Sequence, residues 1–452
     1  MKQKEDPQFK LMTTEPVSRL IPRLAVPTVL SMMITGVYNT ADTYFVSQLG
    51  TSASAAVGIV FSLMAIIQAV GFTLGMGCGS LISRRLGEKN QEAASVYGSS
   101  AFAAAILFGL LLSAFSLSHL KGLVQLLGAT PSITPYAEDY AKWILLGSPV
   151  ICSCFVMNNV LRSEGHAKFS AVALTSGGIL NMLLDPLFIY KFNLGTSGAA
   201  IATVTSQSAS FLIFLQFFIR KKGTVSLGVK YVSLKLKTYA DIMTTGIPSL
   251  FRQGLASVAT IFLNTSAGLY GDAAISAMTI ATKVVMLCGS LMIGIGQGFS
   301  PVAGYNYGAG LYKRVKAAWK WTALVSTCLL LFLGGMIFAF APQIVRWFRN
   351  DDQVVSVGVF ALRAQALSFP LHALIISINM LMQACGKKLQ ATFLSLNRQG
   401  IYFIPLVILL PKIMGLTGVE ISQACADILS ALTAIPYLLL FFRELKKEDS
   451  AL

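Results

Sequence analysis

Apolar stretches, each more than twenty residues long and nearly free of charge, alternate with short polar segments along almost the whole chain. A helix needs about 20 residues to cross the hydrocarbon core of a bilayer. The stretches lack the alternation of strands, and lipid cannot satisfy an open backbone, so the pattern predicts membrane-spanning helices. We expect twelve of them: 20–46, 53–80, 93–116, 137–161, 167–190, 197–219, 239–268, 273–300, 316–341, 354–384, 389–411 and 417–442.

The composition agrees with a membrane-embedded chain and excludes two other classes of protein. Hydrophobic residues make up 55% of the chain and charged residues only 12%, whereas a soluble domain carries about 25% charged residues. Such a chain is neither a water-soluble globule nor a disordered polymer. The seven cysteines fall within or at the ends of the apolar stretches without a CxxC pair, so we interpret them as packing residues.

Lysine and arginine are distributed unevenly over the two sides of the expected bundle. One side, formed by the tails and the even-numbered connections, carries most of them, among them Lys2, Lys4, Arg84, Arg85, Lys221, Lys222, Lys313, Arg314 and Arg398. The opposite side carries only Lys121, Lys142, Lys191, Arg346, Arg349 and Lys412. Because basic residues mark cytoplasmic loops, both termini are expected in the cytoplasm. This distribution also explains the net charge of +16 without a nucleic-acid partner.

The chain contains an internal repeat. A shift of 221 residues aligns identical residues of the two halves, and a shift of 220 continues the match: Pro27 with Pro248, Gly50 with Gly271, Gly77 with Gly298, Asn158 with Asn379 and Gly198 with Gly418. Six spans per copy is an even number, so both copies cross the membrane in the same sense. We expect an all-α membrane protein of two six-helix lobes related by a pseudo-twofold along the membrane normal.

This repeat divides the chain into five expected segments: a cytoplasmic N-terminal tail (1–19), a first lobe (20–220), a cytoplasmic connector (221–238), a second lobe (239–442) and a cytoplasmic C-terminal tail (443–452). The polar N-terminus lacks an apolar core followed by a small-residue cleavage site, so we expect a tail there and no signal peptide. Duplication of this kind is typical of secondary transporters. An ancient duplication in a channel or a scaffold is the alternative.

Two aspartates interrupt the apolar stretches of the first lobe. Asp42 lies eight positions before the outer end of its span, and Asp185 and Thr203 lie at similar distances from the outer ends of theirs. At 1.5 Å rise per residue, all three are expected about 8–12 Å below the outer surface. Tyr38 and Asn181 lie one turn deeper, on the same helix faces as the two aspartates. We therefore expect these five side chains to meet at one point.

An ionisable group inside a membrane is costly, and it is by default a functional candidate. Two neighbouring carboxyl groups in a poorly hydrated pocket repel each other and lose solvation, and both effects favour uptake of a proton. The same oxygen atoms also suit Na⁺, since hard cations take oxygen ligands. The structural alternative is that Asp42 and Asp185 cap helix ends or pair with a lysine. Apart from this possible Na⁺, the sequence predicts no metal and no cofactor.

The second lobe has a different polarity. The repeat places Leu263 and Pro405 at the positions of Asp42 and Asp185, so the acidic site is not duplicated. Four ionisable residues fall near mid-membrane instead: Arg252, Lys283, Arg363 and Asp427. Our hypothesis is that Asp427 neutralises Arg363 or Arg252 and that this cluster locks helix packing. The alternative is that Lys283 contacts substrate or relays protons.

Several segments resemble one family of transporters. Residues 296–309, GQGFSPVAGYNYGA, resemble the signature that follows the eighth helix of MATE (multidrug and toxic compound extrusion) transporters. Asp42, within YNTADT, matches their first-helix acid, and residues 162–165, RSEG, match the end of their fourth helix. Residues 181–186, NMLLDP, match the fifth-helix pattern of the MepA-like and DinF-like branches, whereas the seventh helix departs from the NorM-like acidic pattern.

The resemblance implies a twelve-helix, two-lobed exporter driven by inward H⁺ or Na⁺. It also ties four residues to the coupling-ion site: Asp42, Asn181, Asp185 and Thr203. The candidate substrate contacts are Tyr38, Asn158, Gln207 and Met286. The departure in the seventh helix argues against a second cation site in the second lobe.

We therefore predict a multidrug antiporter for lipophilic, mostly cationic organic compounds, a monomer with multiple spans in the bacterial inner (plasma) membrane. The chain has no GxxxxGK[ST], HExxH or GxSxG motif, so we expect no ATPase and no enzyme. The alternatives are a flippase for lipid-linked oligosaccharides or lipids from the same superfamily, a lipid-modifying intramembrane enzyme, and a channel. A channel is disfavoured because the acidic pair occurs only once.

Overall fold

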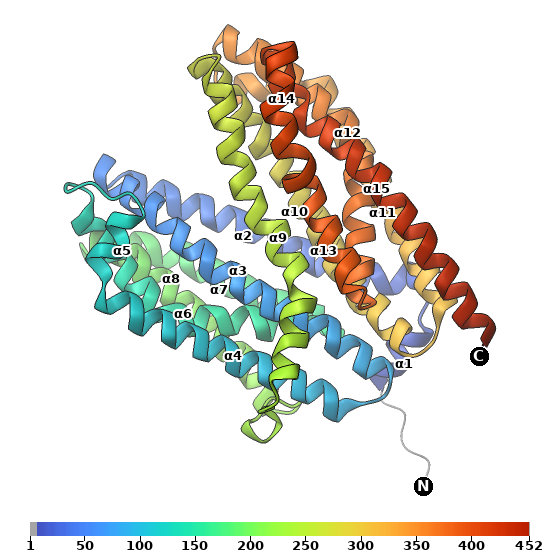
Figure 1. The fold of residues 1–452 in the computed structure, drawn as a ribbon. Coiled ribbons are helices and arrows are strands. Elements are labelled where there is room, and N and C mark those ends of the chain that lie inside the picture. Colours follow the sequence, from blue (N-terminus) through green and yellow to red (C-terminus); the bar gives the residue numbers. More distant parts are fainter. Residues whose placement is uncertain (1–6, 452) are drawn as a thin grey trace. The chain divides into compact units, whose positions relative to one another are not determined.

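The computed structural model describes residues 7–451, apart from the side chains of Asn39 and Ala451 (Figure 1). Within these residues the chain is helical and has no strand: α1 Pro7–Thr14, α2 Val17–Ser47, α3 Thr51–Gly87, α4 Gln91–Ser118, α5 Leu120–Leu126, α6 Thr134–Ser163, α7 Ala167–Pro186, η1 Leu187–Lys191, α8 Gly195–Ile219, η2 Val229–Tyr231, α9 Leu236–Gly268, α10 Asp272–Gly308, α11 Tyr312–Phe348, α12 Asp352–Ala384, α13 Lys388–Leu396, η3 Asn397–Phe403, α14 Ile404–Met414 and α15 Leu416–Ala451. The predicted all-α membrane fold is confirmed.

Eleven helices of the described chain are long and apolar enough to cross a membrane. The twelfth expected span, 239–268, forms α9, which has 33 residues and whose apolar character is interrupted by polar residues such as Arg252 and Gln253. The expected span 389–411 is one continuous helical path through α13, the π-helix η3 and α14. The expected C-terminal tail continues α15 as a helix. Lys2 and Lys4, which the sequence assigns to the cytoplasmic side, lie outside the residues that the structure describes.

The chain forms two compact units. The first unit comprises Val26–Gly246 with the described residues before Met12, and the second unit comprises Met12–Ala25 and Ile247–Leu452. The division therefore falls inside α1, α2 and α9. In the first unit α6 is the central helix and packs against α3, α4 and α8. In the second unit α12 holds the corresponding place, packed against α10, α11 and α15.

The connector belongs wholly to the first unit because serines of α4 and one glutamate hold its backbone. The Ser95 hydroxyl accepts a hydrogen bond from the Ser226 amide at 3.0 Å, and the Ser99 hydroxyl accepts one from the Gly228 amide at 3.1 Å. The Glu164 carboxylate accepts a hydrogen bond from the Thr224 amide at 2.7 Å. These bonds satisfy backbone groups that a loose loop would leave to water.

The segment Gly296–Ala309 fixes the N-terminal stretch to the second unit. The Asn306 amide donates a hydrogen bond to the Met12 carbonyl at 3.1 Å, and the Asn306 side-chain oxygen accepts one from Arg314 at 2.9 Å. A Cβ atom on Gly298 would lie only 2.4 Å from the Cα of Ala25. Small residues permit this close approach of helices, so the signature-like segment has a packing role.

The repeated glycines mark turns that recur in both units. Gly50 precedes α3 with φ +117° and Gly271 precedes α10 with φ +97°. Residues with a Cβ rarely adopt such backbone angles. The repeat in the sequence therefore reflects a shared turn geometry at the start of these two helices.

We predict that adjacent glycines of α11 differ sharply in their tolerance of a methyl group. A Cβ on Gly334 would lie 2.9 Å from the Ala366 carbonyl oxygen of α12, whereas a Cβ on Gly335 meets nothing within 4 Å. Gly334→Ala should destabilise the protein by about 1–3 kcal/mol through overpacking. Gly335→Ala, the matched control, should be neutral or stabilising by about 0.5–1 kcal/mol. Thermal unfolding in detergent measures both, and equal melting temperatures would contradict the packing account.

Candidate functional site

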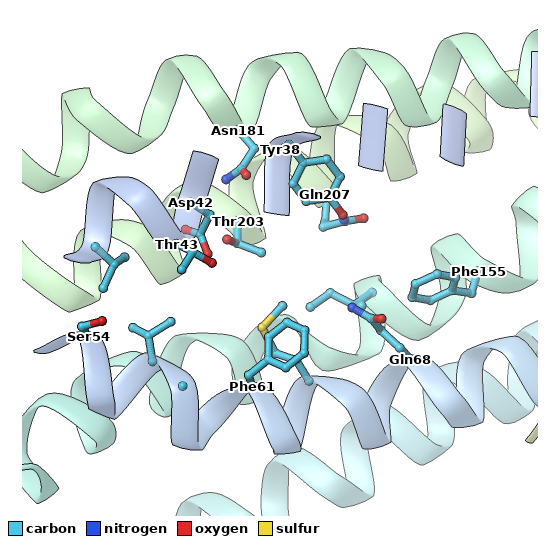
Figure 2. A pocket seen from close by; sticks show the side chains of 15 residues that line it. Tyr38, Asp42, Thr43, Ser54, Phe61, Gln68, Phe155, Asn181, Thr203 and Gln207 are labelled. Atoms are coloured by element: carbon cyan, nitrogen blue, oxygen red, sulfur yellow. The ribbon is translucent and has the colours of Figure 1, made fainter. Parts of the chain in front are cut away.

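The first unit contains a cavity of about 360 Å³. Helices α2, α3, α6, α7 and α8 contribute its lining residues. Figure 2 shows Asp42, Asn181 and Thr203 gathered on one side of the cavity, across from Phe61 and Gln68 of α3. The cavity thus joins a polar side with a carboxylate to a wall that is largely apolar.

The structure brings the predicted coupling residues together. Asp42, Asn181 and Thr203 line the cavity. Asp185 is fully buried and does not line the cavity, and its carboxylate accepts a hydrogen bond from the Asn181 amide at 3.1 Å. Asp42 and Asp185 are close enough to interact electrostatically. Asn181 therefore links the buried carboxyl group to the cavity.

The acidic pair has no counter-ion among the residues that the structure describes, since neither aspartate takes part in an ion pair there. Three buried oxygens also lack a hydrogen-bond donor in that part of the chain: one each of Asp42, Asn181 and Asp185. An unsatisfied buried acceptor costs about 1–3 kcal/mol. A carboxylate oxygen can bind a proton, and carboxylate and amide oxygens can coordinate Na⁺. The residues present therefore fit a small cation.

Local helix geometry positions the two carboxyl groups. Pro186 follows Asp185 and ends α7, because proline has no amide proton to continue the helix; the chain then continues as the π-helix η1. Within η1, the Tyr190 hydroxyl donates a hydrogen bond to the Phe45 carbonyl at 2.6 Å. This bond ties η1 to the end of α2, three residues after Asp42, and so holds the helices of both aspartates together.

The sequence did not indicate two tyrosines near the site. One is Tyr190, whose hydrogen bond to α2 could not be predicted from its position shortly after Asp185. Tyr140 of α6 is fully buried, contacts Thr203 and lies within electrostatic reach of both carboxyl groups. Its only sequence signal is its position three residues inside the expected span 137–161, at a shallower depth than that of the aspartates.

The candidate substrate contacts separate into two groups. Tyr38 and Gln207 line the cavity. Asn158 is 1% exposed, and its side-chain oxygen accepts a hydrogen bond from Ser170. Its counterpart in the repeat, Asn379, donates one to the Ala391 carbonyl at 2.8 Å. Each asparagine therefore joins two consecutive helices of its unit.

Met286, the fourth candidate substrate contact, lies on α10 in the second unit and is 71% exposed. It is not among the residues that line the cavity of the first unit. In the sequence, a methionine that faces a cavity cannot be distinguished from one that faces lipid, because both lie in an apolar helix.

The hypothesis that Asp427 neutralises Arg252 or Arg363 is wrong. Asp427 pairs with Arg398, whose Nε lies 2.7 Å from the Asp427 carboxylate. Arg252 instead donates to the Asn379 side-chain oxygen at 2.9 Å, and Arg363 donates to the Phe338 carbonyl and stacks over the ring of Phe338. Lys283 is exposed. The four residues expected near mid-membrane therefore form no single cluster.

The count of basic residues assigned Arg398 to a cytoplasmic connection, although the expected span 389–411 contains it. In the structure Arg398 lies in η3, ten residues past the first residue of α13. A π-helical turn accommodates one additional residue within a helix. The insertion also changes the register of the repeat in this helix.

The counterpart of Asp185 is accordingly corrected from Pro405 to Val407. Gly198 packs against the Phe188 carbonyl and Gly418 packs against the Leu410 carbonyl, so the register at the end of these helices is a shift of 222. Val407 is fully buried, as Asp185 is. The acidic site is still present only once, because Val407 is apolar.

Comparison with known proteins identifies the family. The family model MatE matches residues 27–187 and 248–409, once in each half of the chain. The multidrug export protein MepA of Staphylococcus saprophyticus is 26% identical over 96% of this chain and 97% of its own length. MepA of Staphylococcus aureus strain MSSA476 is 27% identical over the same shares of the two chains.

Solved structures give the same result. One described as the outward-facing conformation of a multidrug resistance MATE family transporter of the MOP superfamily superposes with a TM-score of 0.92 and 26% identity over 98% of this chain and 100% of its own. A crystal structure of MATE in complex with MaL6 superposes with a TM-score of 0.91 over the same shares. The apolar helices and these matches together show that this multi-pass membrane protein belongs to the MatE family.

Proposed function

We propose that this protein exports lipophilic, mostly cationic organic compounds by antiport with H⁺ or Na⁺, and that Asp42 and Asp185 bind the coupling cation. The observation that carries the proposal is a cavity lined by Asp42 and Asn181, with the buried Asp185 hydrogen-bonded to Asn181 and with three buried acceptor oxygens that lack a donor in the described chain. The relatives named multidrug export protein support the substrate class.

The lining of the cavity suits such a substrate. Phe61, Met64 and Phe155 offer an apolar surface, and Tyr38 adds an aromatic ring near Asp42. Aromatic faces attract organic cations, and a single carboxylate in an apolar pocket favours a cationic over a neutral ligand. Ligand pockets of about 300–1,000 Å³ hold drug-sized molecules, and the cavity falls at the lower end of this range.

Competition for one negative charge is the proposed mechanism. When Asp42 and Asp185 are ionised, the pocket attracts the organic cation. A proton or Na⁺ arriving from the outside cancels one of the two negative charges of the pair, and the organic cation, whose electrostatic attraction to the site is then weaker, leaves. Asn181 serves both states, because its amide donates to Asp185 while its oxygen remains free to accept. Alternating exposure of the site to the two sides completes the cycle.

We place the protein in the bacterial inner (plasma) membrane as a monomer with both termini in the cytoplasm. The uneven distribution of lysine and arginine supports this orientation. A fluorescent protein fused after the C-terminus should therefore fluoresce, and alkaline phosphatase fused at the same place should be inactive in cells. The reverse pair of results would contradict the orientation.

Neutralising either aspartate should uncouple export. We expect Asp42→Asn and Asp185→Asn to lower gradient-driven ethidium efflux from vesicles on the order of tenfold, within the usual range of coupling energies. Asp42→Asn should also weaken ethidium binding, because Asp42 lines the cavity, whereas Asp185→Asn should affect coupling more than binding. Imposing proton and sodium gradients separately identifies the coupling ion.

Glu420→Gln is the matched control, because Glu420 is a buried acid of the second unit, 5% exposed. It should keep wild-type efflux. Unchanged efflux in both aspartate variants would remove the proposed coupling site.

A bulky residue at Gly58 should block the cavity without touching the carboxyl groups. Gly58 lines the cavity, and a Cβ there meets nothing within 4 Å. Gly58→Phe should lower substrate binding by at least about tenfold, since the ring would occupy the pocket volume. Gly36→Phe is the control, because Gly36 has equal space around it and does not line the cavity. Equal binding of tetraphenylphosphonium by both variants would show that the substrate binds elsewhere.

A further inference from the structure

The second unit holds a buried ion pair that the coupling mechanism does not use. Arg398 of η3 and Asp427 of α15 lie 2.7 Å apart, with side chains 17% and 3% exposed. Asp427 also accepts hydrogen bonds from Ser368 of α12 at 2.9 Å and from Gln423 at 3.1 Å. Both carboxylate oxygens are therefore satisfied. The other titratable group that faces the pair is His372 of α12, which is 4% exposed.

The repeat places this pair at the counterpart of the cavity in the first unit. The matching contacts of Gly198 and Gly418 fix a shift of 220 at the start of α8 and α15. Asp427 then corresponds to Gln207 and Gln423 to Thr203, and both of these residues of α8 line the cavity.

The central helices give the same placement. Asn158 of α6 and Asn379 of α12 make equivalent bonds to the next helix, which fixes a shift of 221 between these two helices. His372 then corresponds to Ile151, which also lines the cavity. Asp427 and two side chains beside it, Gln423 and His372, thus occupy positions that form the cavity wall in the first unit.

Arg398 reaches this place from a π-helix that interrupts its span earlier than the π-helix η1 does in the first unit. The corresponding helix of the first unit, α7, is regular from Ala167 to Pro186. In the second unit the π-helix η3 begins at Asn397 and carries the additional residue. The arginine and the insertion that positions it therefore occur together.

We propose that Arg398 is a built-in counter-cation, which fills in the second unit the place that the exchangeable coupling cation takes in the first. The inference rests on the proposed coupling function and names Arg398 as the residue that restricts cation exchange to one unit. A guanidinium covalently attached to the chain cannot leave, so the charge of Asp427 is always compensated and Asp427 does not bind H⁺ or Na⁺. Without Arg398, the buried carboxylate of Asp427 would keep two neutral donors and need a mobile cation.

Counting bound cations in purified protein tests this proposal. Arg398→Gln should bind one more monovalent cation per molecule than wild type, measured as protons by potentiometric titration and as Na⁺ with a radioactive tracer. The double variant Arg398→Gln/Asp427→Asn, which removes both charges, should return to the wild-type count. Because His372 interacts with both charges, the count is repeated with His372→Gln in every variant, so that a proton on His372 is excluded as the additional cation. Arg398→Lys, which keeps a tethered cation, should match wild type. A folded Arg398→Gln protein with the wild-type count would overturn the proposal.

Transport by the double variant Arg398→Gln/Asp427→Asn is a second, independent test of the proposal. This test can be made even if Arg398→Gln alone fails to fold. Replacing a buried ion pair by neutral residues is often tolerated, so ethidium efflux should stay within about twofold of wild type. Loss of efflux in this variant would mean that the pair itself takes part in transport, and the proposal would fall. The cation count does not depend on Asp42, so failure of the coupling site, seen as unchanged efflux in Asp42→Asn, remains distinguishable.

Discussion

A carboxyl group buried in a membrane protein must be compensated by a proton, a metal cation or a basic side chain, because desolvation of an unpaired charge costs several kcal/mol. The two units of this protein meet the requirement differently. In the second unit, Arg398 and two hydrogen-bond donors surround Asp427. In the first unit, Asp42 and Asp185 interact with each other, and the described chain offers them no cation. The proposed transport cycle depends on this difference.

The rest of the fold holds the acidic pair in place. Tyr190 connects the helix end after Asp185 to the end of α2, and Asn181 connects Asp185 to the cavity. The hydrogen bonds between the connector backbone and the hydroxyls of Ser95 and Ser99 secure α4 to the connector within the same unit. Rigid support of this kind matters for a binding site, because small displacements of a carboxylate change its affinity strongly.

The sequence predicts the acidic site well because depth in a membrane can be counted. Residues at equal distances from the outer ends of their spans lie at similar height, and this argument places Asp42, Asn181 and Thr203 around what the structure shows as a cavity. The register of helix faces is harder to read. The repeat has a shift of 221 before the π-helix η3, of 222 after it and of 220 at the start of α8 and α15, so a single shift of 220 placed Pro405 where Val407 belongs. Hydrogen bonds between distant segments, such as that of Tyr190, leave no periodic signal at all.

Equilibrium competition between the organic cation and the coupling cation tests the central claim most directly. Tetraphenylphosphonium binding to the purified protein is measured together with the protons or Na⁺ released into a weakly buffered solution. If Asp42 and Asp185 share one exchangeable charge, each bound organic cation releases a coupling cation, and acidification or added Na⁺ weakens binding in proportion. Organic cation binding that releases nothing, and that proceeds equally well at acid and alkaline pH with or without Na⁺, would contradict the account.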